Sequence, residues 1–453
     1  MSKITLRQAA QWCGGRVDEK YADVTFLGAN MDSRKIQPGQ LFIALVGERD
    51  GHDYIPMARE KGAAAVLCSR ECGDVPAIIV EDPRLALGAI ARQERQRLGM
   101  KVVGVTGSVG KSTTKEMIAC VLDSTYKTEK TPVNHNNDLG MPMAILAMPE
   151  DTEVAVLEMG MNHFREIAYL TDIAKPDVAV IINIGTVHIE YLGSREGILQ
   201  AKLEILEGTK EDASVIFNGD DPMLWGHRKQ TDRDITYFGE ENYQASVRAV
   251  NVTEEENLLR FRVVVGEESQ PVELMLDGRH YVSDALAAIA VGRALGVSLE
   301  KASKSLADFQ NMAGRQEIFE AKGFTVIKDC YNASPESMKA ALTVLGRRQG
   351  RRIAVLGDML ELGACTQAEH YRIGRIAAEK ADIVFAYGPN GSRVISGAVT
   401  GGMQENQARA YEDREKIVSA LKYLVKPGDV LLFKGSHGMR LDLILDEMLK
   451  EEA

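Results

Sequence analysis

Short, uninterrupted apolar runs alternate with helical stretches along most of the chain. In the middle of the sequence these runs are KVVGV (101–105), EVAVLEMG (153–160), DVAVIINIG (177–185) and ASVIFNGDD (213–221). A strand that is apolar at nearly every position is buried on both faces, as in a parallel sheet between layers of helices. The pattern therefore predicts a βαβ series here and an α/β fold class.

The pattern changes between about residues 236 and 276, where apolar and polar residues alternate in LLRFRVVVGE and QPVELML. Alternation is typical of strands with one exposed face, so we expect an antiparallel patch at the edge of this sheet. Two helices, YVSDALAAIAVGRALG (281–296) and LEKASKSLADF (299–309), are predicted to follow.

Two further α/β segments are predicted on either side of the middle one. Before it, the strand candidates are LFIALVG (41–47), AAAVLC (63–68) and AIIVE (77–81), followed by a helix, LALGAIARQERQRLG. After it, the strand candidates are FTVIKD, RRIAVLGD (351–358), ADIVFAYG (381–388) and DVLLFKGS (429–436), which predict a second doubly wound sheet. The 453 residues suit about three domains of about 150 residues each. We place these domains at residues 1–98, 99–312 and 313–453.

Composition and charge limit the kinds of molecule that the protein is expected to bind. The chain is 45% hydrophobic and 26% charged, as globular proteins are, and its net charge is −11 without a long Lys/Arg run. This balance argues against nucleic acid or an anionic membrane as the main partner. The N-terminal MSKITLRQAAQWCGG lacks a signal-peptide core, and no run approaches about 18 apolar residues. The six cysteines lack zinc-site spacing, so we expect reduced thiols in a cytoplasmic protein without a membrane span.

The stretch GVTGSVGKSTTKEM (104–117) is typical of a phosphate cradle that opens a helix. The strict P-loop pattern has a glycine five residues before Gly110, where this chain has Val105. Glycines still let backbone N–H groups approach phosphate oxygens, and the helix N-terminus favours an anion. Lys111 is expected to reach the β/γ-phosphates and Ser112 to hold Mg²⁺. The alternative is a glycine-rich turn with an incidental lysine.

Two polar side chains follow neighbouring apolar strands. Glu158 ends EVAVLEMG like the acid of a Walker B strand, so Mg²⁺ is its natural partner; otherwise it caps the next helix. His188, in NIGTVHIEYLG, follows the next strand, where a lone histidine is more often structural than a ligand. Because these strands adjoin the P-loop strand, Glu158, His188 and the P-loop are able to converge on one point.

Other candidates have equally ordinary interpretations. Lys202, in REGILQAKLEIL, looks like a solvated helix lysine, and the asparagines of TPVNHNNDLGMP (131–142) are typical of a turn. Asp329 and Asn332 either read a ribose or phosphate or cap the helix that starts near 335. The loops GDMLELG and KGSHG also follow apolar strands and are able to line a second-substrate site.

Together these motifs resemble those of the Mur ligases over essentially the whole chain. DSRKIQPGQLFIALVGERDGHDY resembles that family's uridine-nucleotide domain. TGSVGKSTTKE, TPVNHNNDLGMP, LEMGMN and QAKLEIL match its ATPase domain in order and spacing, and GRQE, DCYNASPES, GDMLELG and KGSHG match its C-terminal domain. The chain departs from the family pattern in two motifs, and the first reads His280-Tyr281-Val282-Ser283-Asp284-Ala285 where the family has H-N-x-x-N-A. Asp284 replaces the second Asn of H-N-x-x-N-A, and Ser334 replaces a usual Asn in YNASP.

The resemblance implies three domains: a uridine-nucleotide-binding α/β domain, a P-loop ATPase domain with a mostly parallel sheet, and a Rossmann-like domain. The absence of a D-N-P-R signature, together with EMGMN and GDMLELG, disfavours the relative that adds the third amino acid. The implied reaction joins D-alanyl-D-alanine to UDP-N-acetylmuramoyl-tripeptide. ATP would activate the peptide carboxylate as an acyl phosphate, which the dipeptide amine would attack, giving the UDP-linked pentapeptide precursor of peptidoglycan.

The resemblance also implies residue roles. ATP would be bound by Gly107, Ser108, Val109, Gly110, Lys111, Ser112, Thr113, Asp284 (adenine), Arg315 (γ-phosphate), Asp329 (ribose) and Asn332. Two Mg²⁺ ions would be held by Ser112, Glu158, His188 and a carbamylated Lys202. The catalytic set would be Lys111, Glu158, His188, Lys202 and Arg315. Substrate would contact Ser33, Arg34, Arg49, Asp50, Gly51, His52, Asn134, Asn136 and Asn137. A monomer is expected.

Three alternatives belong to other classes or relatives. A regulatory P-loop NTPase that reads guanine would carry an NKxD motif, and none occurs. A non-catalytic nucleotide-binding module is disfavoured because Lys111, Ser112, Glu158 and His188 are all present. Folylpolyglutamate synthase is a further ligase alternative, although its relatives lack an N-terminal domain of the DSR…DGHDY type.

Overall fold

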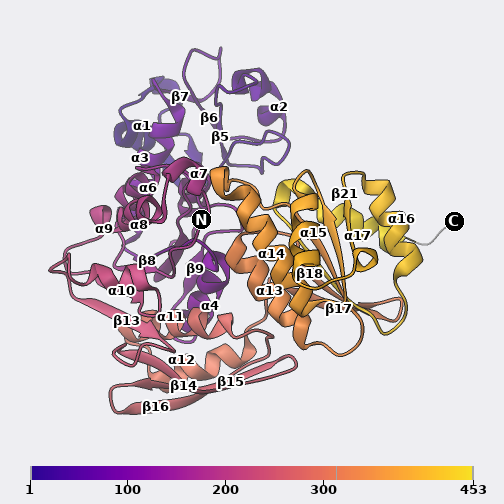
Figure 1. The fold of residues 1–453 in the computed structure, drawn as a ribbon. Coiled ribbons are helices and arrows are strands. Elements are labelled where there is room, and N and C mark those ends of the chain that lie inside the picture. Colours follow the sequence, from indigo (N-terminus) through magenta and orange to yellow (C-terminus); the bar gives the residue numbers. More distant parts are fainter. Residues whose placement is uncertain (1–2, 313, 451–453) are drawn as a thin grey trace.

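The computed structural model describes residues 3–312 and 314–450, and these residues form a mixed α/β fold built on mostly parallel sheets (Figure 1). The parts follow one another along the chain, from indigo through magenta to yellow in Figure 1. No helix among these residues is long and apolar enough to cross a membrane. The α/β class predicted from the apolar runs is therefore confirmed.

The N-terminal part contains a sheet of order β2-β7-β6-β5-β4, in which β2 is an antiparallel edge and the other strands are parallel. Its strands are β2 (Arg16–Val17), β4 (Ala29–Asn30), β5 (Leu41–Ile43), β6 (Ala65–Cys68) and β7 (Ala77–Ile79), and β1 (Ile4–Thr5) pairs separately with β3 (Thr25–Phe26). The helices are α1 (Leu6–Cys13), α2 (Ile55–Glu60) and α3 (Pro83–Leu98). The predicted strands of this part are present but shorter than their apolar runs.

The central part has a sheet of order β16-β15-β14-β13-β12-β11-β8-β10-β9. Its strands are β8 (Lys101–Thr106), β9 (Thr128–Lys130), β10 (Val154–Glu158), β11 (Val178–Ile181), β12 (Ser214–Asn218), β13 (Ile235–Gly239), β14 (Val247–Glu255), β15 (Leu258–Val265) and β16 (Glu268–Leu274). The antiparallel patch is confirmed for β14–β16. Its predicted start is too early, because β13 still pairs in parallel with β12 and β14.

Helices cover both faces of this central sheet. They are α4 (Lys111–Asp123), α5 (Gly140–Leu146), α6 (Glu166–Ala174), α7 (Ile189–Leu192), α8 (Arg195–Leu203), α9 (Ile205–Gly208), α10 (Pro222–His227), α11 (His280–Ala294) and α12 (Leu299–Ser305). The register of the sheet pairs Val105 of β8 with both Glu158 of β10 and Val180 of β11. The carboxyl ends of these three parallel strands therefore lie at one edge, where ligands bind in open α/β sheets.

The C-terminal part has a sheet of order β17-β18-β22-β19-β20-β21, parallel except for the β17 edge. Its strands are β17 (Glu317–Ala321), β18 (Phe324–Asp329), β19 (Arg352–Gly357), β20 (Ile383–Tyr387), β21 (Ala408–Tyr411) and β22 (Val430–Lys434). Its helices are α13 (Pro335–Arg347), α14 (Thr366–Lys380), α15 (Gly391–Thr400), α16 (Arg414–Leu424) and α17 (Leu441–Leu449). The predicted boundaries at 98 and 312 stay predictions, and residue 313 lies outside the described residues.

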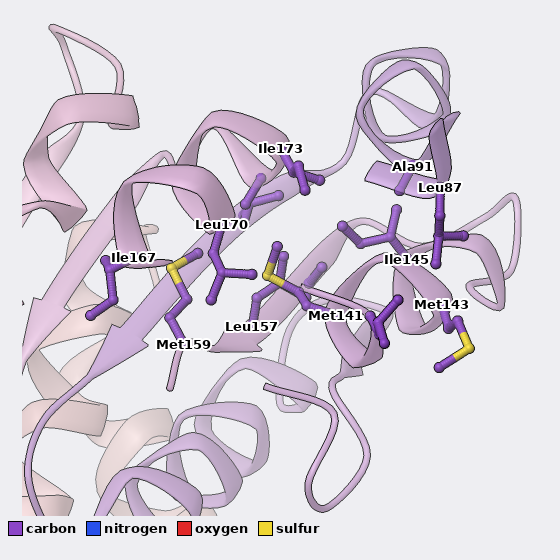
Figure 2. Close-up of a cluster of buried hydrophobic side chains, with 14 of the residues drawn as sticks. Leu87, Ala91, Met141, Met143, Ile145, Leu157, Met159, Ile167, Leu170 and Ile173 are labelled. Atoms are coloured by element: carbon purple, nitrogen blue, oxygen red, sulfur yellow. The ribbon is translucent and has the colours of Figure 1, made fainter. Parts of the chain in front are cut away.

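One hydrophobic core runs from the N-terminal part into the central part. Figure 2 shows Leu87 and Ala91 of α3 beside Ile145 of α5, with Leu170 of α6 and Leu157 of β10 in the same cluster. These side chains are almost fully buried. The helix that closes the first predicted domain is thus packed against α5 and α6 of the central part by burial of apolar surface.

We predict that Leu87→Ala lowers the free energy of unfolding by about 2–5 kcal/mol, because it leaves a cavity in this core. Leu85 provides the matched control on the same helix, since it is 57% exposed whereas Leu87 is 0% exposed. Leu85→Ala should change stability by no more than about 0.5 kcal/mol. Urea unfolding of the two variants checks this, and equal midpoints would contradict the shared core.

Candidate active site

The phosphate-cradle sequence forms a tight turn between β8 and α4. Gly110 is the N-cap of α4 and has a φ of +85°. A Cβ atom at Gly110 would also lie 2.9 Å from Asp284 Oδ1, so both backbone conformation and space favour glycine. The first residues of α4 therefore present their N–H groups at the edge of the sheet, as an anion site requires.

Asn183, which follows β11, holds this turn in place. Its Oδ1 accepts hydrogen bonds from Ser108 N (2.9 Å) and Val109 N (3.0 Å), and its Nδ2 donates to Val109 O (2.9 Å). The next loop adds a bond from Gly185 N to Ser108 Oγ (2.8 Å). Asn183 was not predicted as a site residue, although it lies in NIGTVH five residues before His188.

Lys111 folds back over the turn that precedes it. Its Nζ donates to Gly107 O (2.8 Å) and Ser108 O (3.3 Å). Burial lowers the pKa of Lys111; Arg315 lowers it further, and the Glu158 charge opposes both. The ammonium is thus held beside the backbone that is predicted to bind phosphate.

Arg315 reaches Ser112 from the C-terminal part. Its Nη2 donates to Ser112 Oγ (3.1 Å), and its guanidinium carbon lies 3.7 Å from the centre of the Tyr331 ring. The Tyr331 hydroxyl in turn donates to Asn134 Oδ1 of the asparagine-rich loop. Two contacts therefore connect the C-terminal part to the predicted nucleotide site, and Tyr331 is a further residue that motif reasoning did not single out.

Glu158 lies buried at the end of β10, as predicted. Its Oε1 accepts from Asn136 Nδ2 (2.9 Å), and its Oε2 lies 4.0 Å from Lys115 Nζ. Lys115 is fully buried one turn after Lys111 and donates to Thr131 O (2.7 Å). Lys115 was also missed, because a lysine inside a helix pattern gives no sign that it faces inward.

His188 is the N-cap of α7 and has a left-handed conformation, with a φ of +63°. Its Nδ1 lies 2.5 Å from Glu361 Oε2 of the GDMLELG loop but is not aligned with it as a hydrogen bond. Burial lowers the pKa of His188, and Lys111 and Lys202 lower it further. A neutral imidazole is the form that binds a metal ion.

Lys202 is 2% exposed, so the solvated-helix interpretation is wrong. The face of α8 that carries it packs inward, which a lone lysine in the sequence cannot reveal. No hydrogen bond or ion pair joins its Nζ to any residue that the structure describes. Burial, and then the Lys111 charge, lower the pKa of Lys202 well below its ordinary value.

Asp284 lies buried behind the P-loop. Its Oδ1 accepts from Thr114 Oγ1 (2.6 Å), yet burial raises the pKa of Asp284 to about 7.

Asp329, at the end of β18, pairs with the buried Lys434, whose Nζ donates to Asp329 Oδ2 (2.6 Å) and Asn332 O (3.1 Å). Ser334, the other departure from the family pattern, caps α13 by accepting from Ser337 N (3.3 Å).

A cavity of about 880 Å³ gathers most of the predicted site. Its lining includes Ser108, Val109, Gly110, Lys111, Ser112, Thr113, Asn136, Asn137, Glu158, His188, Asp284, Arg315, Asp329 and Asn332. Lys202, Gly107 and Asn134 are not in this lining. Glu158, His188 and the P-loop follow three neighbouring strands and line one cavity, which agrees with the predicted convergence.

The candidates of the N-terminal part lie apart from this cavity. Arg34 is exposed and forms two bonds to Asp32, each 2.9 Å long. Asp50 caps the turn Gly51–Tyr54 and accepts from His52 Nδ1 (2.6 Å) and Arg70 Nη2 (2.6 Å). Ser33 is buried beside Met57, and Arg49 is exposed. Their predicted role in binding a nucleotide diphosphate stays a prediction.

The predicted metal ligands partly suit Mg²⁺. Among residues 3–312 and 314–450, no three His, Cys, Asp or Glu side chains cluster as a preformed metal cage. Mg²⁺ usually takes one or two carboxylates and completes its shell with water and phosphate oxygens, so Glu158 and the Ser112 hydroxyl fit that pattern. The Arg315 guanidinium donates to the Ser112 hydroxyl, which is the group that the sequence predicts to hold Mg²⁺.

The fold and this cavity define a P-loop nucleotide-binding protein of the α/β class. Comparisons identify the family: the profile "Mur ligase middle domain" matches residues 105–292, "Mur ligase, glutamate ligase domain" matches 314–437, and "Mur ligase family, catalytic domain" matches 24–95. The UDP-N-acetylmuramoyl-tripeptide--D-alanyl-D-alanine ligase of Bacillus subtilis is 39% identical over 99% of both chains.

Solved structures agree. A crystal structure of MurF from Acinetobacter baumannii matches with a TM-score of 0.92 and 31% identity over 100% of both chains. MurF from Thermotoga maritima in complex with ADP matches with a TM-score of 0.83 and 32% identity, over 94% of this chain and 97% of that one. The chain belongs to the Mur ligase family, and the resemblance inferred from its motifs is confirmed.

The raised pKa of Asp284 predicts a pH effect on stability. The folded protein holds this proton up to about pH 7, whereas an unfolded Asp releases it near pH 3.9. Folding thus binds a proton between these values, so this contribution to stability is lost as pH rises from about 4 to about 7. Asp284→Asn keeps an acceptor for Thr114 but does not titrate. Its free energy of unfolding, relative to that of the wild type, should therefore increase by at least about 1.4 kcal/mol as pH rises over this range. Guanidinium unfolding of both proteins at several pH values checks this; a difference that does not vary with pH would contradict it.

Proposed function

We propose that the chain is an ATP-dependent ligase that joins D-alanyl-D-alanine to UDP-N-acetylmuramoyl-tripeptide and forms the UDP-linked pentapeptide precursor of peptidoglycan. The observation that carries this proposal is the match over 99% of both chains to a relative of that name. The cavity supports it, because a phosphate cradle, an opposing arginine and strand-end loops of the C-terminal part meet there.

The chemistry explains why the groups expected to face the phosphates are cationic side chains and backbone N–H donors. A free carboxylate reacts poorly with an amine because it lacks a good leaving group, and transfer of the γ-phosphoryl group supplies one. Phosphoryl transfer mainly needs positioning and neutralisation of phosphate charge. Lys111 and the N–H groups at the start of α4 would hold the phosphates from one side. Arg315, already at Ser112, would approach the γ-phosphate from the other.

Mg²⁺ would be held by Ser112, Glu158, His188 and Lys202 as a carbamate, two ions in all. When bound, Mg²⁺ neutralises phosphate oxygens and orients them. In this proposal Asp329 and Asn332 contact the ATP ribose, and Asp284 lies beside the adenine. As a carboxyl group with a raised pKa, Asp284 is partly protonated near neutral pH, so it is able to donate as well as accept a hydrogen bond.

The remaining assignments rest on the family pattern. Ser33, Arg34 and the loop 49–52 would hold the uridine diphosphate end, and Asn134, Asn136 and Asn137 would contact the substrate. A monomer in the cytoplasm is proposed. The three domains would be residues 1–98, 99–312 and 313–453.

Product formation tests the function. The protein would be incubated with ATP, Mg²⁺, D-Ala-D-Ala and UDP-muramoyl-tripeptides that carry either diaminopimelate or lysine, and pentapeptide would be sought by mass spectrometry. Lys111→Ala should lower the rate on the order of 10²-fold or more, because it removes a phosphate-facing charge from a preorganised site. ATP hydrolysis without pentapeptide would favour a regulatory NTPase instead.

Carbamylation of Lys202 is tested separately. A buried, neutral lysine amine is able to add CO₂, and the product offers negatively charged oxygens to Mg²⁺. Labelled bicarbonate should give a carbamate carbon signal that Lys202→Ala lacks, and this variant should lose activity on the order of 10²-fold or more. The exposed Lys304, which pairs with Glu300 on α12, provides the control for replacing a helix lysine. A fully active Lys202→Ala would show that the assignment is wrong.

A further inference from the structure

Glu336, in the first turn of α13, reaches from the C-terminal part toward the central part. Its Oε1 accepts a hydrogen bond from Thr186 Oγ1 (3.1 Å), and its side chain lines the large cavity. Its Oε2 is buried and has no hydrogen-bond partner among the residues that the structure describes. A buried carboxylate oxygen without a donor is costly, so a bound group that supplies one would be favoured.

The other acidic side chains of the cavity lining are already engaged. Asp138 pairs with Arg84, Glu158 with Asn136, Glu166 with the backbone N–H of Asn162, Asp284 with Thr114, and Asp329 with Lys434. Within the described lining, Glu336 is therefore the carboxylate with a buried oxygen left unpartnered.

A helix-capping role does not explain this burial. An acid in a first helical turn stabilises the helix dipole while it stays in water. Glu415 does so in the first turn of α16, where it is exposed. Glu336 instead is held against the loop that follows β11, since a Cβ atom at Gly185 would lie only 3.0 Å from its Oε1. Gly185 N also donates to Ser108 Oγ, so the carboxylate lies beside the loop that follows β11, which contacts the P-loop and ends at His188.

The charge of Glu336 selects the kind of group that fits there. Phosphates and carboxylates would be repelled, whereas an ammonium group supplies both positive charge and N–H donors. An α-amino group has a pKa of about 7.7–8.0, so the incoming dipeptide is mostly an ammonium ion at neutral pH. We propose that Glu336 binds the protonated amino group of D-alanyl-D-alanine and so positions its nitrogen at this edge of the site. The assignment rests on the proposed function.

Steady-state kinetics of Glu336→Gln test this, with each of the three substrates varied in turn. Gln keeps the shape and an acceptor for Thr186 but removes the charge. The KM for D-Ala-D-Ala should rise on the order of tenfold or more, as expected for loss of a hydrogen bond to a charged group. The KM values for ATP and the UDP-tripeptide should stay within about twofold. Glu336→Asp should recover part of the loss, and Glu415→Gln, a matched first-turn variant, should behave as wild type.

The outcomes are distinct. Wild-type protein that makes no pentapeptide overturns the proposed function and this inference with it. An active wild-type protein together with an unchanged KM for the dipeptide in Glu336→Gln overturns the inference alone. A rise confined to the KM for the UDP-tripeptide also overturns it, because Glu336 would then bind the side-chain ammonium of the third residue. A similar rise in all three KM values would assign Glu336 a structural role and equally overturn it.

Discussion

The arrangement of the site depends on the register of three parallel strands. Because β8 lies between β10 and β11, the chain leaves all three strands at the same edge of the sheet. The P-loop, Glu158 and the loop from Asn183 to His188 are then neighbours, whatever their distance in sequence. The Asn183 side chain converts this proximity into a fixed geometry, because it uses the N–H groups of Ser108 and Val109 and the carbonyl of Val109.

Buried charge is the second constraint, and it follows from the first. Burial lowers the pKa of Lys111 and of Lys202 and raises the pKa of Asp284, so each shift favours the uncharged form of the side chain. Such groups weaken the fold, and their shifts are therefore typical of sites arranged for binding or catalysis. Anionic phosphates, and a carbamate at Lys202, would reduce the free-energy cost of burying positive charge at the two lysines.

Much of the fold was predictable because burial on both faces leaves continuous apolar runs, as in β8, β10, β11 and β12. The strands that were missed are very short, as β1, β2, β3, β4 and β9 are, or carry exposed polar residues at a sheet edge, as β17 and β21 do. The P-loop, Glu158 and Arg315 were predictable as motif members. Asn183, Lys115 and Tyr331 were not, because their roles depend on partners from distant segments. Lys202 was misjudged by sequence alone, since helical periodicity does not show which face of α8 is covered.

The C-terminal part completes the site through side chains that cross to the central part. Arg315 meets Ser112, Tyr331 meets Asn134, and Glu336 meets Thr186, while the main apolar cores of the two parts remain separate. Polar contacts of this kind are individually modest compared with burial of a core. The N-terminal part, by contrast, shares the continuous core around Leu87 and Leu157. The phosphate cradle and the groups that oppose it are therefore joined by polar side chains rather than by a continuous apolar core.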